Sequence, residues 1–168
     1  MSIFRIESEP SLGIEGLAYK LAYIIRPGAS SLKTIYTVNV SFDAVFEEMV
    51  RVKEIHSQLR GKCYIHYEFR INEKLDEGIG LDDIYRMGVA VAKYVAHYNE
   101  HFYQAVMSVH NEPGIPLHFH IIANNIDMVT GKRFSPDLCD IFAMRRATDR
   151  IAQENGISII QQKGKWQR

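Results

Sequence analysis

Three of the chain's seven histidines, His110, His118 and His120, fall within eleven positions of one another. The segments around them, 104–110 and 116–125, are predicted to be two strands joined by the turn-rich stretch NEPGI. Side chains two apart on a strand point to the same face, so His118 and His120 point together, and a hairpin brings His110 beside them. Three neutral imidazoles suit Mn²⁺, Zn²⁺, Co²⁺ or Ni²⁺. Without a fourth protein ligand, such a centre keeps positions for water or substrate, as catalytic sites do.

The stretch KCYIHYEFRI, residues 62–71, is also predicted to be a strand with its polar groups on one face. A period of two places five side chains together: Lys62, Tyr64, His66, Glu68 and Arg70. Either His66 or Glu68 can then take a proton from a nucleophile, or orient a metal-binding histidine through its second nitrogen. The alternative is an ordinary solvated sheet face, which is common in antiparallel sheets.

The first predicted helix carries candidate nucleophiles. Tyr19 and Tyr23 are four apart and both lie opposite the apolar stripe, so helical position does not separate them. Lys20, Tyr23 and Arg26 form one ridge, which sets a phenol between two cations that attract phosphate. This ridge favours Tyr23, while Tyr19 and Tyr36 stay open as alternatives.

These segments belong to a chain of alternating helices and strands without a long repeat. We expect helices at 12–26, 41–60, 81–98 and 135–156, and strands at 34–40, 62–71, 104–110, 116–125 and 157–161. Ser41 is expected to cap the second helix and Ser135-Pro136 to open the last. The pattern predicts an α/β (α+β layered) fold with a mainly antiparallel central sheet and helices packed on one face. We expect one domain over 1–168, with 161–168 a tail or a truncated junction.

The composition is that of an ordinary globular protein, with 168 residues, 46% hydrophobic residues and a formal net charge of zero. Zero net charge argues against non-specific coating of nucleic acid but allows a local basic cleft. No apolar stretch approaches the roughly 20 residues that span a bilayer, and the N-terminus lacks a signal-peptide pattern. Cys63 and Cys139 are predicted to be buried thiols in a reducing cytosol, so we expect a cytoplasmic protein.

A family resemblance is carried by a histidine, seven residues, His-hydrophobic-His, an apolar strand and the pattern Asn-x-x-Asp-x-x-Thr-Gly-Lys. In this chain the matching residues are His110, His118-Phe119-His120, the strand 121–124 and the following stretch 125–133. The pattern resembles the relaxases of plasmid mobilisation, which are HUH endonucleases, where U is a hydrophobic residue.

The front of the chain carries a second part of the resemblance. LAYIIRPGAS, residues 21–30, is similar to the family's tyrosine motif, in which a tyrosine precedes an aliphatic pair and a turn. Tyr23 is followed by Ile24-Ile25 and by Pro27-Gly28, whereas Tyr19 fits less well. The tyrosine comes first and the histidines last, which is the relaxase order and the reverse of that in rolling-circle replication initiators.

The resemblance implies a relaxase-like fold and metal-dependent nicking and religation of one DNA strand at an origin of transfer, which begins the mobilisation of a plasmid or integrated element. Carried over, Tyr23 attacks the scissile phosphate and stays joined to the new 5′ end. The three histidines hold one divalent ion, usually Mg²⁺ or Mn²⁺. His66 is preferred to Glu68 as the supporting group, because its place resembles the family's middle strand.

The partners are also implied by the resemblance. They are single-stranded origin DNA, an accessory relaxosome protein and a coupling protein at the secretion channel, in a bacterial cytoplasm. We expect DNA contacts from seven polar residues: Lys20, Arg26, Lys62, Arg70, Asn124, Lys132 and Arg133. Tyr64 or Tyr19 is expected to stack on bases.

Two alternatives stay open. The first is a relative that binds origin DNA without cutting it, which the neutral charge and short length favour. The second is an unrelated three-histidine metalloenzyme that uses metal-bound water. Replacing Tyr23 separates the second alternative from a relaxase, because a water-based hydrolase should tolerate the change.

Overall fold

Five segments rich in β-branched and aromatic residues form one sheet in the computed structural model, which describes residues 3–7, 13–72 and 75–158. The strands are β1 (Ile3–Glu7), β2 (Ile35–Val38), β3 (Tyr64–Arg70), β4 (Ala105–His110) and β5 (His118–Asn124). Their order across the sheet is β1-β3-β5-β4-β2, and every neighbouring pair is antiparallel. The antiparallel sheet that the sequence predicts is confirmed.

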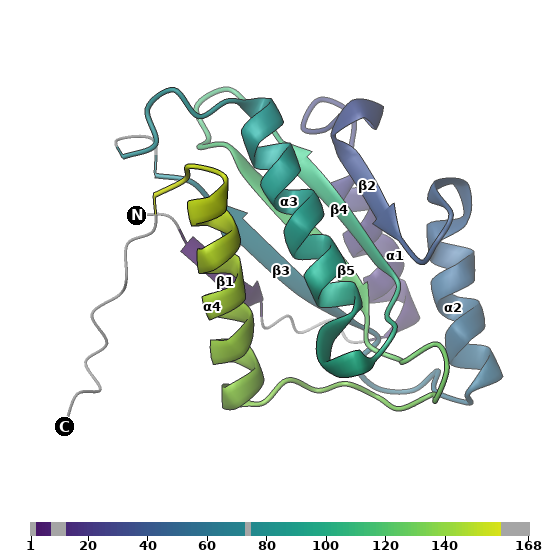
Figure 1. Cartoon of the computed structure of the whole chain (residues 1–168). Coiled ribbons are helices and arrows are strands. Elements are labelled where there is room, and N and C mark those ends of the chain that lie inside the picture. The colour runs from purple at the N-terminus through teal and green to yellow at the C-terminus, as the bar shows by residue number, and fades with distance from the viewer. Residues whose placement is uncertain (1–2, 8–12, 73–74, 159–168) are drawn as a thin grey trace.

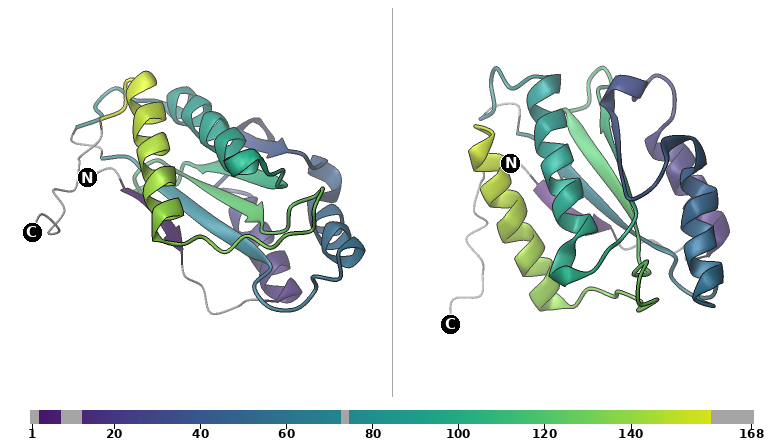
Figure 2. Two further views of the ribbon diagram at one scale, coloured as in Figure 1. Left: turned by 60° about the horizontal axis from the view of Figure 1, so that its bottom comes forward. Right: turned by 45° about the vertical axis from the view of Figure 1, so that its right-hand side comes forward.

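Four helices in the described part of the chain cover this sheet: α1 (Ile14–Ile24), α2 (Val45–Ile55), α3 (Leu81–Ala96) and α4 (Leu138–Glu154). Figures 1 and 2 show α3 and α4 on one face and α1 and α2 on the other, so the molecule has three layers rather than helices on one face alone. None of these described helices is long and apolar enough to cross a membrane.

Each face of the sheet has its own apolar cluster. The larger cluster joins α3 and α4 to the inward side chains of β3, β4 and β5, among them Tyr67, Met107 and Phe119. On the other face, Val106 and Ile122 interrupt the polar pattern and pack in a cluster with α1 and α2. These two apolar residues explain why a second helical layer covers part of a face that is otherwise polar.

The predicted elements differ from the observed ones mainly at their ends. β1 is absent from the prediction, although its last four residues, FRIE, alternate between apolar and polar. Helix α4 begins at Leu138, because Asp137 and not Ser135 is its N-cap and accepts a hydrogen bond from the Asp140 amide at 2.9 Å. Ser41 precedes a 3₁₀ turn, Phe42–Ala44, and makes no side-chain capping bond.

The end of the described chain leaves two predictions open. Ile157 and Ser158 are not in a strand. The rest of the strand predicted at 157–161, and the tail predicted at 161–168, lie outside the described residues. Cys63 is buried as predicted, but Cys139 is exposed.

The stretch that matches Asn-x-x-Asp-x-x-Thr-Gly-Lys forms a tight loop after β5. Asp127 Oδ1 accepts from the amides of Val129 and Thr130 at 2.8 and 2.7 Å, while Oδ2 accepts from the Phe102 amide at 3.2 Å and from His101 Nδ1 at 2.6 Å. Burial raises the pKa of Asp127, but these four hydrogen bonds outweigh burial and bring the pKa to about 2. This part of the motif therefore stabilises the fold.

Gly131 places the same loop against the end of α2. Its φ is +70°, and a Cβ at this position would lie 2.6 Å from Cγ of His56, whose Nε2 lies 3.1 Å from the Met128 carbonyl oxygen. Only glycine satisfies both the left-handed backbone and the close approach.

Gly131→Ala should lower the free energy of unfolding by about 2–4 kcal/mol, because it adds a steric clash to backbone strain. Gly156→Ala is the matched control, since Gly156 has a φ of +72° and no atom lies within 4 Å of the position that its Cβ would take. The free energy of unfolding of the control should fall by only about 1 kcal/mol. Urea unfolding measures both values, and equal losses would show that the contact with His56 is unimportant.

Asp127 should make stability depend on acid pH. A carboxylate whose pKa is lower in the folded state stabilises the fold fully above about pH 4 and loses that contribution as the pH falls toward 2. Between about pH 4 and pH 2 the free energy of unfolding of the parent protein should therefore fall by about 2 kcal/mol more than that of Asp127→Asn. Unfolding by urea at both pH values tests this; parallel losses in the two proteins would contradict it.

Candidate metal centre

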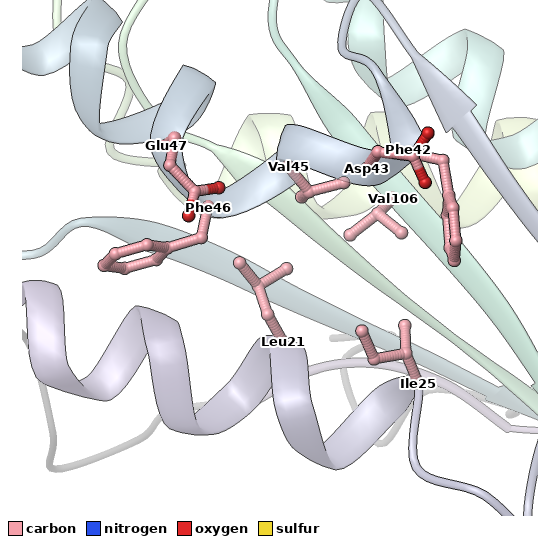
Figure 3. Close-up of a pocket in the computed structure, with 8 residues that line it drawn as sticks. All are labelled: Leu21, Ile25, Phe42, Asp43, Val45, Phe46, Glu47 and Val106. Atoms are coloured by element: carbon pink, nitrogen blue, oxygen red, sulfur yellow. The ribbon is translucent and has the colours of Figure 1, made fainter.

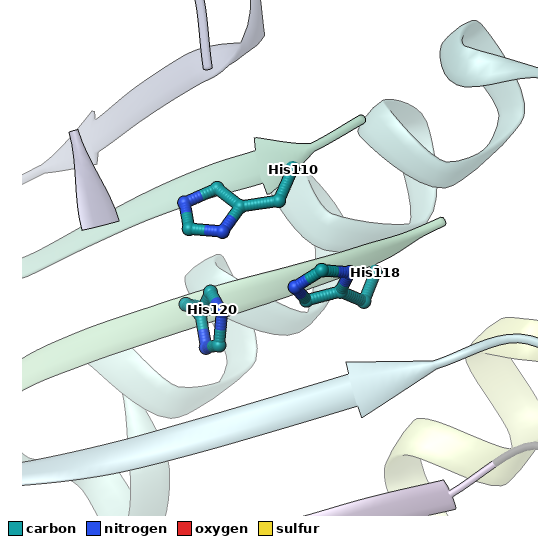
Figure 4. Close-up of side chains that lie close together, drawn as sticks. All are labelled: His110, His118 and His120. Atoms are coloured by element: carbon teal, nitrogen blue, oxygen red, sulfur yellow. The ribbon is translucent and has the colours of Figure 1, made fainter. Parts of the chain in front are cut away.

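The register of the sheet brings the three histidines together. His110 on β4 is directly opposite His118 on β5, and His120 is opposite Ser108 on one side and Glu68 on the other. Figure 4 shows the three rings gathered on the same side of the sheet. One nitrogen from each ring lies within 4.8 Å of the other two, so the convergence that the sequence predicts is confirmed.

A hydrogen bond fixes the second nitrogen of each ring. His110 Nε2 donates to the Ile24 carbonyl at 2.8 Å, and His118 Nδ1 donates to the Pro116 carbonyl at 2.8 Å. Because a carbonyl only accepts, Nδ1 of His110 and Nε2 of His118 keep their lone pairs. His120 Nδ1 lies 2.9 Å from Nε2 of His66, which turns His120 Nε2 toward the other two rings.

The environment of the rings suits a metal ion. All three histidines are buried, and burial lowers the pKa of each imidazole, so the rings stay neutral near pH 7. His110 Nδ1 and His120 Nε2 are buried without a hydrogen-bond partner among the described residues. Such atoms are costly to bury unless a ligand pairs with them. The three histidines therefore form a site that can hold one divalent metal ion.

The two predicted supporting residues lie in different surroundings. His66 is buried and contacts the centre directly through His120. Glu68 is buried too, but its Oε2 accepts from Arg5 at 2.8 Å and its Oε1 accepts from Arg70 at 2.9 Å. Burial raises the pKa of Glu68, yet the two arginines outweigh burial and lower it overall. Glu68 is thus an ion-paired carboxylate and a poor proton acceptor.

The packing of α1 separates the three tyrosines. The Tyr23 ring lies 5.9 Å from the His110 ring and 5.6 Å from the His120 ring, measured between centroids. Tyr19 is 70% exposed on the same helix. Tyr36 pairs with Met107 in the sheet, and so faces the α3 layer on the opposite side from the histidines. The structure therefore brings Tyr23, and neither alternative, to the metal centre.

Two cations flank the Tyr23 ring, as the helical ridge predicts. Lys20 Nζ lies 5.1 Å from the ring centroid, and Arg26 Cζ lies 4.2 Å from it. Arg26 also donates to both carboxylate oxygens of Glu112, at 2.8 and 2.9 Å. Burial lowers the pKa of Arg26, but its contacts with Glu112 and Tyr23 raise it overall. Glu112, which lies in the β4–β5 hairpin, is not among the site residues that the sequence predicts. Its position as an acidic residue between His110 and His118 is the sequence feature that could have indicated it.

Comparison with known proteins decides the family. Residues 23–157 match the family described as relaxase, MobA/VirD2-like, nuclease domain. The chain belongs to this relaxase family. No curated protein matches the chain by sequence.

Solved structures share the relaxase fold. The chain resembles the MobM relaxase domain (MOBV; Mob_Pre), bound to plasmid pMV158 oriT DNA and Mn, with a TM-score of 0.65 and 12% identity over 96% of this chain and 90% of that one. It also resembles a chain from the structure described as the molecular basis of vancomycin resistance transfer in Staphylococcus aureus. There the TM-score is 0.59 and the identity 11%, over 95% of this chain and 96% of that one.

The relaxase centre gathers only part of the predicted DNA-binding set. Lys20 and Arg26 flank Tyr23, and Arg70 is opposite His118 in the sheet. Four residues lie at or beyond the other end of the sheet: Lys62, Asn124, Lys132 and Arg133. Asn124 is four strand residues from His120, which is about 13 Å.

Contacts within the protein already occupy several of these far groups. Buried Asn124 accepts from Lys53 and donates to the Met49 carbonyl and to Gln104. Arg133 donates to backbone carbonyls in the 58–62 segment, including that of Arg60 at 2.8 Å. These contacts stabilise the fold, and DNA binding by Asn124 and Arg133 stays a prediction. Tyr64 is buried under α1 and cannot stack on a base.

A separate hollow of about 180 Å³ lies between α1 and the start of α2 (Figure 3). Its apolar wall includes Leu21 and Ile25, each two residues from Tyr23 and therefore about 200° away around the helix. Asp43 and Glu47 add negative charge, which disfavours a phosphate. This hollow is on the other side of α1 from the metal centre.

Metal binding should depend on both the ligands and His66. His118→Ala should weaken Mn²⁺ binding by more than about 100-fold, and His66→Ala by about 10–100-fold, because loss of an orienting group costs that much. His97→Ala is the control, since His97 is exposed at the end of α3. Titration calorimetry with Mn²⁺ measures the three constants. An unchanged constant for His118→Ala would exclude the three-histidine site.

Proposed function

We propose that this relaxase domain nicks and religates one strand of DNA at an origin of transfer, with Tyr23 as the nucleophile, and so begins the mobilisation of a plasmid or integrated element. The observation that carries the proposal is the contact of the Tyr23 ring with His110 and His120. MobM, which shares the fold, is bound to oriT DNA and Mn, and this supports the same class of substrate and metal.

The reaction is an exchange of one phosphodiester for another. The Tyr23 oxygen forms a bond to the scissile phosphorus, and the bond from that phosphorus to the 3′ oxygen breaks. The phenol loses its proton and the departing 3′ oxygen gains one. The 5′ phosphate stays on Tyr23, so the bond energy is kept and the reverse reaction needs no other energy source.

The residues of the centre divide the remaining tasks. A divalent ion held by the three histidines supplies Lewis-acid polarisation of a phosphate oxygen, with Mg²⁺ or Mn²⁺ as the proposed ions. Neutral imidazoles leave that ion its full charge. The hydrogen bond from His110 to the Ile24 carbonyl holds the residue next to Tyr23 beside the ligands.

Supporting roles follow from the contacts. His66 orients His120 through the ring nitrogen that does not face the centre, as outer groups around metals do. Arg26 and Lys20 offset the negative charge of the phosphate next to the phenol. Glu68 supports neither proton transfer nor the metal in this proposal, because its oxygens are paired with arginines.

The proposed setting is a bacterial cytoplasm, where the origin DNA is located. An accessory relaxosome protein and a coupling protein are proposed partners, because origin DNA must be opened before a single-strand nuclease can act and the cut strand must be exported.

Tyr23→Phe should abolish the covalent protein–DNA adduct, because a phenyl ring has no oxygen to attack phosphorus. Tyr19→Phe is the matched control, four residues away on the same helix and exposed, and it should form adduct at the parent rate. The protein is incubated with Mn²⁺ and labelled single-stranded oligonucleotides tiled across the DNA flanking its gene. The adduct appears as a slow, protease-sensitive band on a denaturing gel.

The other outcomes separate the alternatives. DNA binding without adduct in the parent protein would indicate a relative that binds but does not cut. Adduct that persists in Tyr23→Phe would keep the reaction and move the nucleophile to another tyrosine. Cleavage without adduct, unaffected by the change, would indicate a hydrolase that uses metal-bound water.

A further inference from the structure

A line of three charged side chains extends from the metal centre toward the β1 edge of the sheet. Arg70 on β3 is opposite His118, and Glu68 on β3 is opposite His120. Arg5 on β1 is in turn opposite Glu68. Strands are about 4.8 Å apart, so Arg70 is one strand and Arg5 two strands from the histidine strand.

One carboxylate fixes both arginines. Glu68 Oε2 accepts from Nε and NH2 of Arg5 at 3.3 and 2.8 Å, while Oε1 accepts from Arg70 at 2.9 Å. The Glu68 side chain is only 6% exposed, but those of Arg5 and Arg70 are 52% and 38% exposed. A buried anion thus holds two solvent-facing guanidinium groups in place, and the trio keeps a net positive charge.

The arrangement of Arg5, Glu68 and Arg70 is better explained by phosphate binding than by a contribution to the stability of the fold. Burial of the Glu68 carboxylate costs desolvation energy that offsets much of its attraction to the arginines, so the two bridges add little net stability to β1. Guanidinium groups that are already ordered lose little freedom when they bind a phosphate, and they can bind it through paired N–H donors. The distance from the histidines to Arg70 and Arg5 corresponds to roughly one or two nucleotides of an extended strand.

The position of Tyr23 indicates which part of the DNA strand would pass over Arg70 and Arg5. Tyr23 touches His110 and His120, whereas Arg70 lies beside His118. In-line attack requires the departing 3′ oxygen to lie opposite the attacking phenol. The strand that ends in this 3′ oxygen therefore leaves toward the His118 side, where Arg70 and Arg5 lie.

We propose that Arg5 and Arg70, held by Glu68, form a phosphate clamp for the DNA segment that ends in the new 3′-hydroxyl. The proposal rests on the proposed nicking function. The clamp retains this segment after cleavage, when no covalent bond holds it, and keeps the hydroxyl in place for religation. Its ligand is the sugar–phosphate backbone, so it does not read sequence.

The first test needs neither metal nor cleavage. Replacing only the arginines would leave a buried unpaired carboxylate that can unfold the protein, so the test variant is the triple change Arg5→Gln, Glu68→Gln and Arg70→Gln. Arg150→Gln is the control, an exposed arginine on α4 in the opposite layer. Thermal unfolding by circular dichroism first checks that both variants fold.

Binding of fluorescein-labelled oligothymidylate is then measured by anisotropy in EDTA at several salt concentrations. The triple variant should bind about tenfold more weakly than the control, and its log–log salt slope should be smaller by about 1.4, from about 0.7 for each of two phosphates. A folded triple variant with the affinity and slope of the control would overturn the clamp, whether or not the protein cuts DNA.

The second test uses the covalent complex. DNA labelled on the 3′-hydroxyl side of the cut should leave the adduct of the triple variant about tenfold faster than it leaves the adduct of the control, and religation per adduct should fall with it. Equal release rates would contradict the clamp. Loss of adduct in the parent protein itself would instead contradict the proposed nicking function, leaving the binding test in EDTA to decide on the clamp.

Discussion

The hydrogen bond from His110 Nε2 to the Ile24 carbonyl joins two parts of the molecule that must stay aligned. One end is a strand that presents metal ligands, and the other is the last turn of the helix that carries Tyr23. At a helix end the carbonyl groups lack partners within the helix, so Ile24 can accept this bond without breaking another. The same bond sets the tautomer of His110 and the distance of Tyr23 from the centre.

The sheet can hold so many polar groups in its interior because its two faces differ. One face is almost entirely apolar and packs on α3 and α4, which fixes the strands in register. On the other face, buried polar groups lie in pairs or small networks, such as Lys53 with Asn124 and Asn125. Lys53 is fully buried, and burial lowers the pKa of its ammonium group to about 8.

The sequence is informative where a period of two decides the outcome, whereas the predicted capping residues Ser41 and Ser135 do not cap the helices. The alternation in 62–71 and 116–125, with the hairpin that joins 104–110 to 116–125, is enough to gather the three histidines and His66 on one face. It cannot separate the two ends of that face, and Asn124 was therefore grouped with residues about 13 Å away. Tyr19 and Tyr23 are equivalent on an isolated helix, and only the packing of α1 on the sheet distinguishes them. Arg5 was missed because β1 is a single short strand, whose partner is far away in the chain.

The strand order has a consequence for how the centre behaves as the molecule fluctuates. β5, which supplies two of the three ligands, is the middle strand and bonds to a neighbour on each side. Local opening begins at edges and loops, and reaches a central strand only when most of the domain opens. His120 is therefore held inside the central strand, while His110 and His118 adjoin the hairpin loop. An ion bound to all three would tie the hairpin end of the sheet to its protected centre and so stabilise the native state.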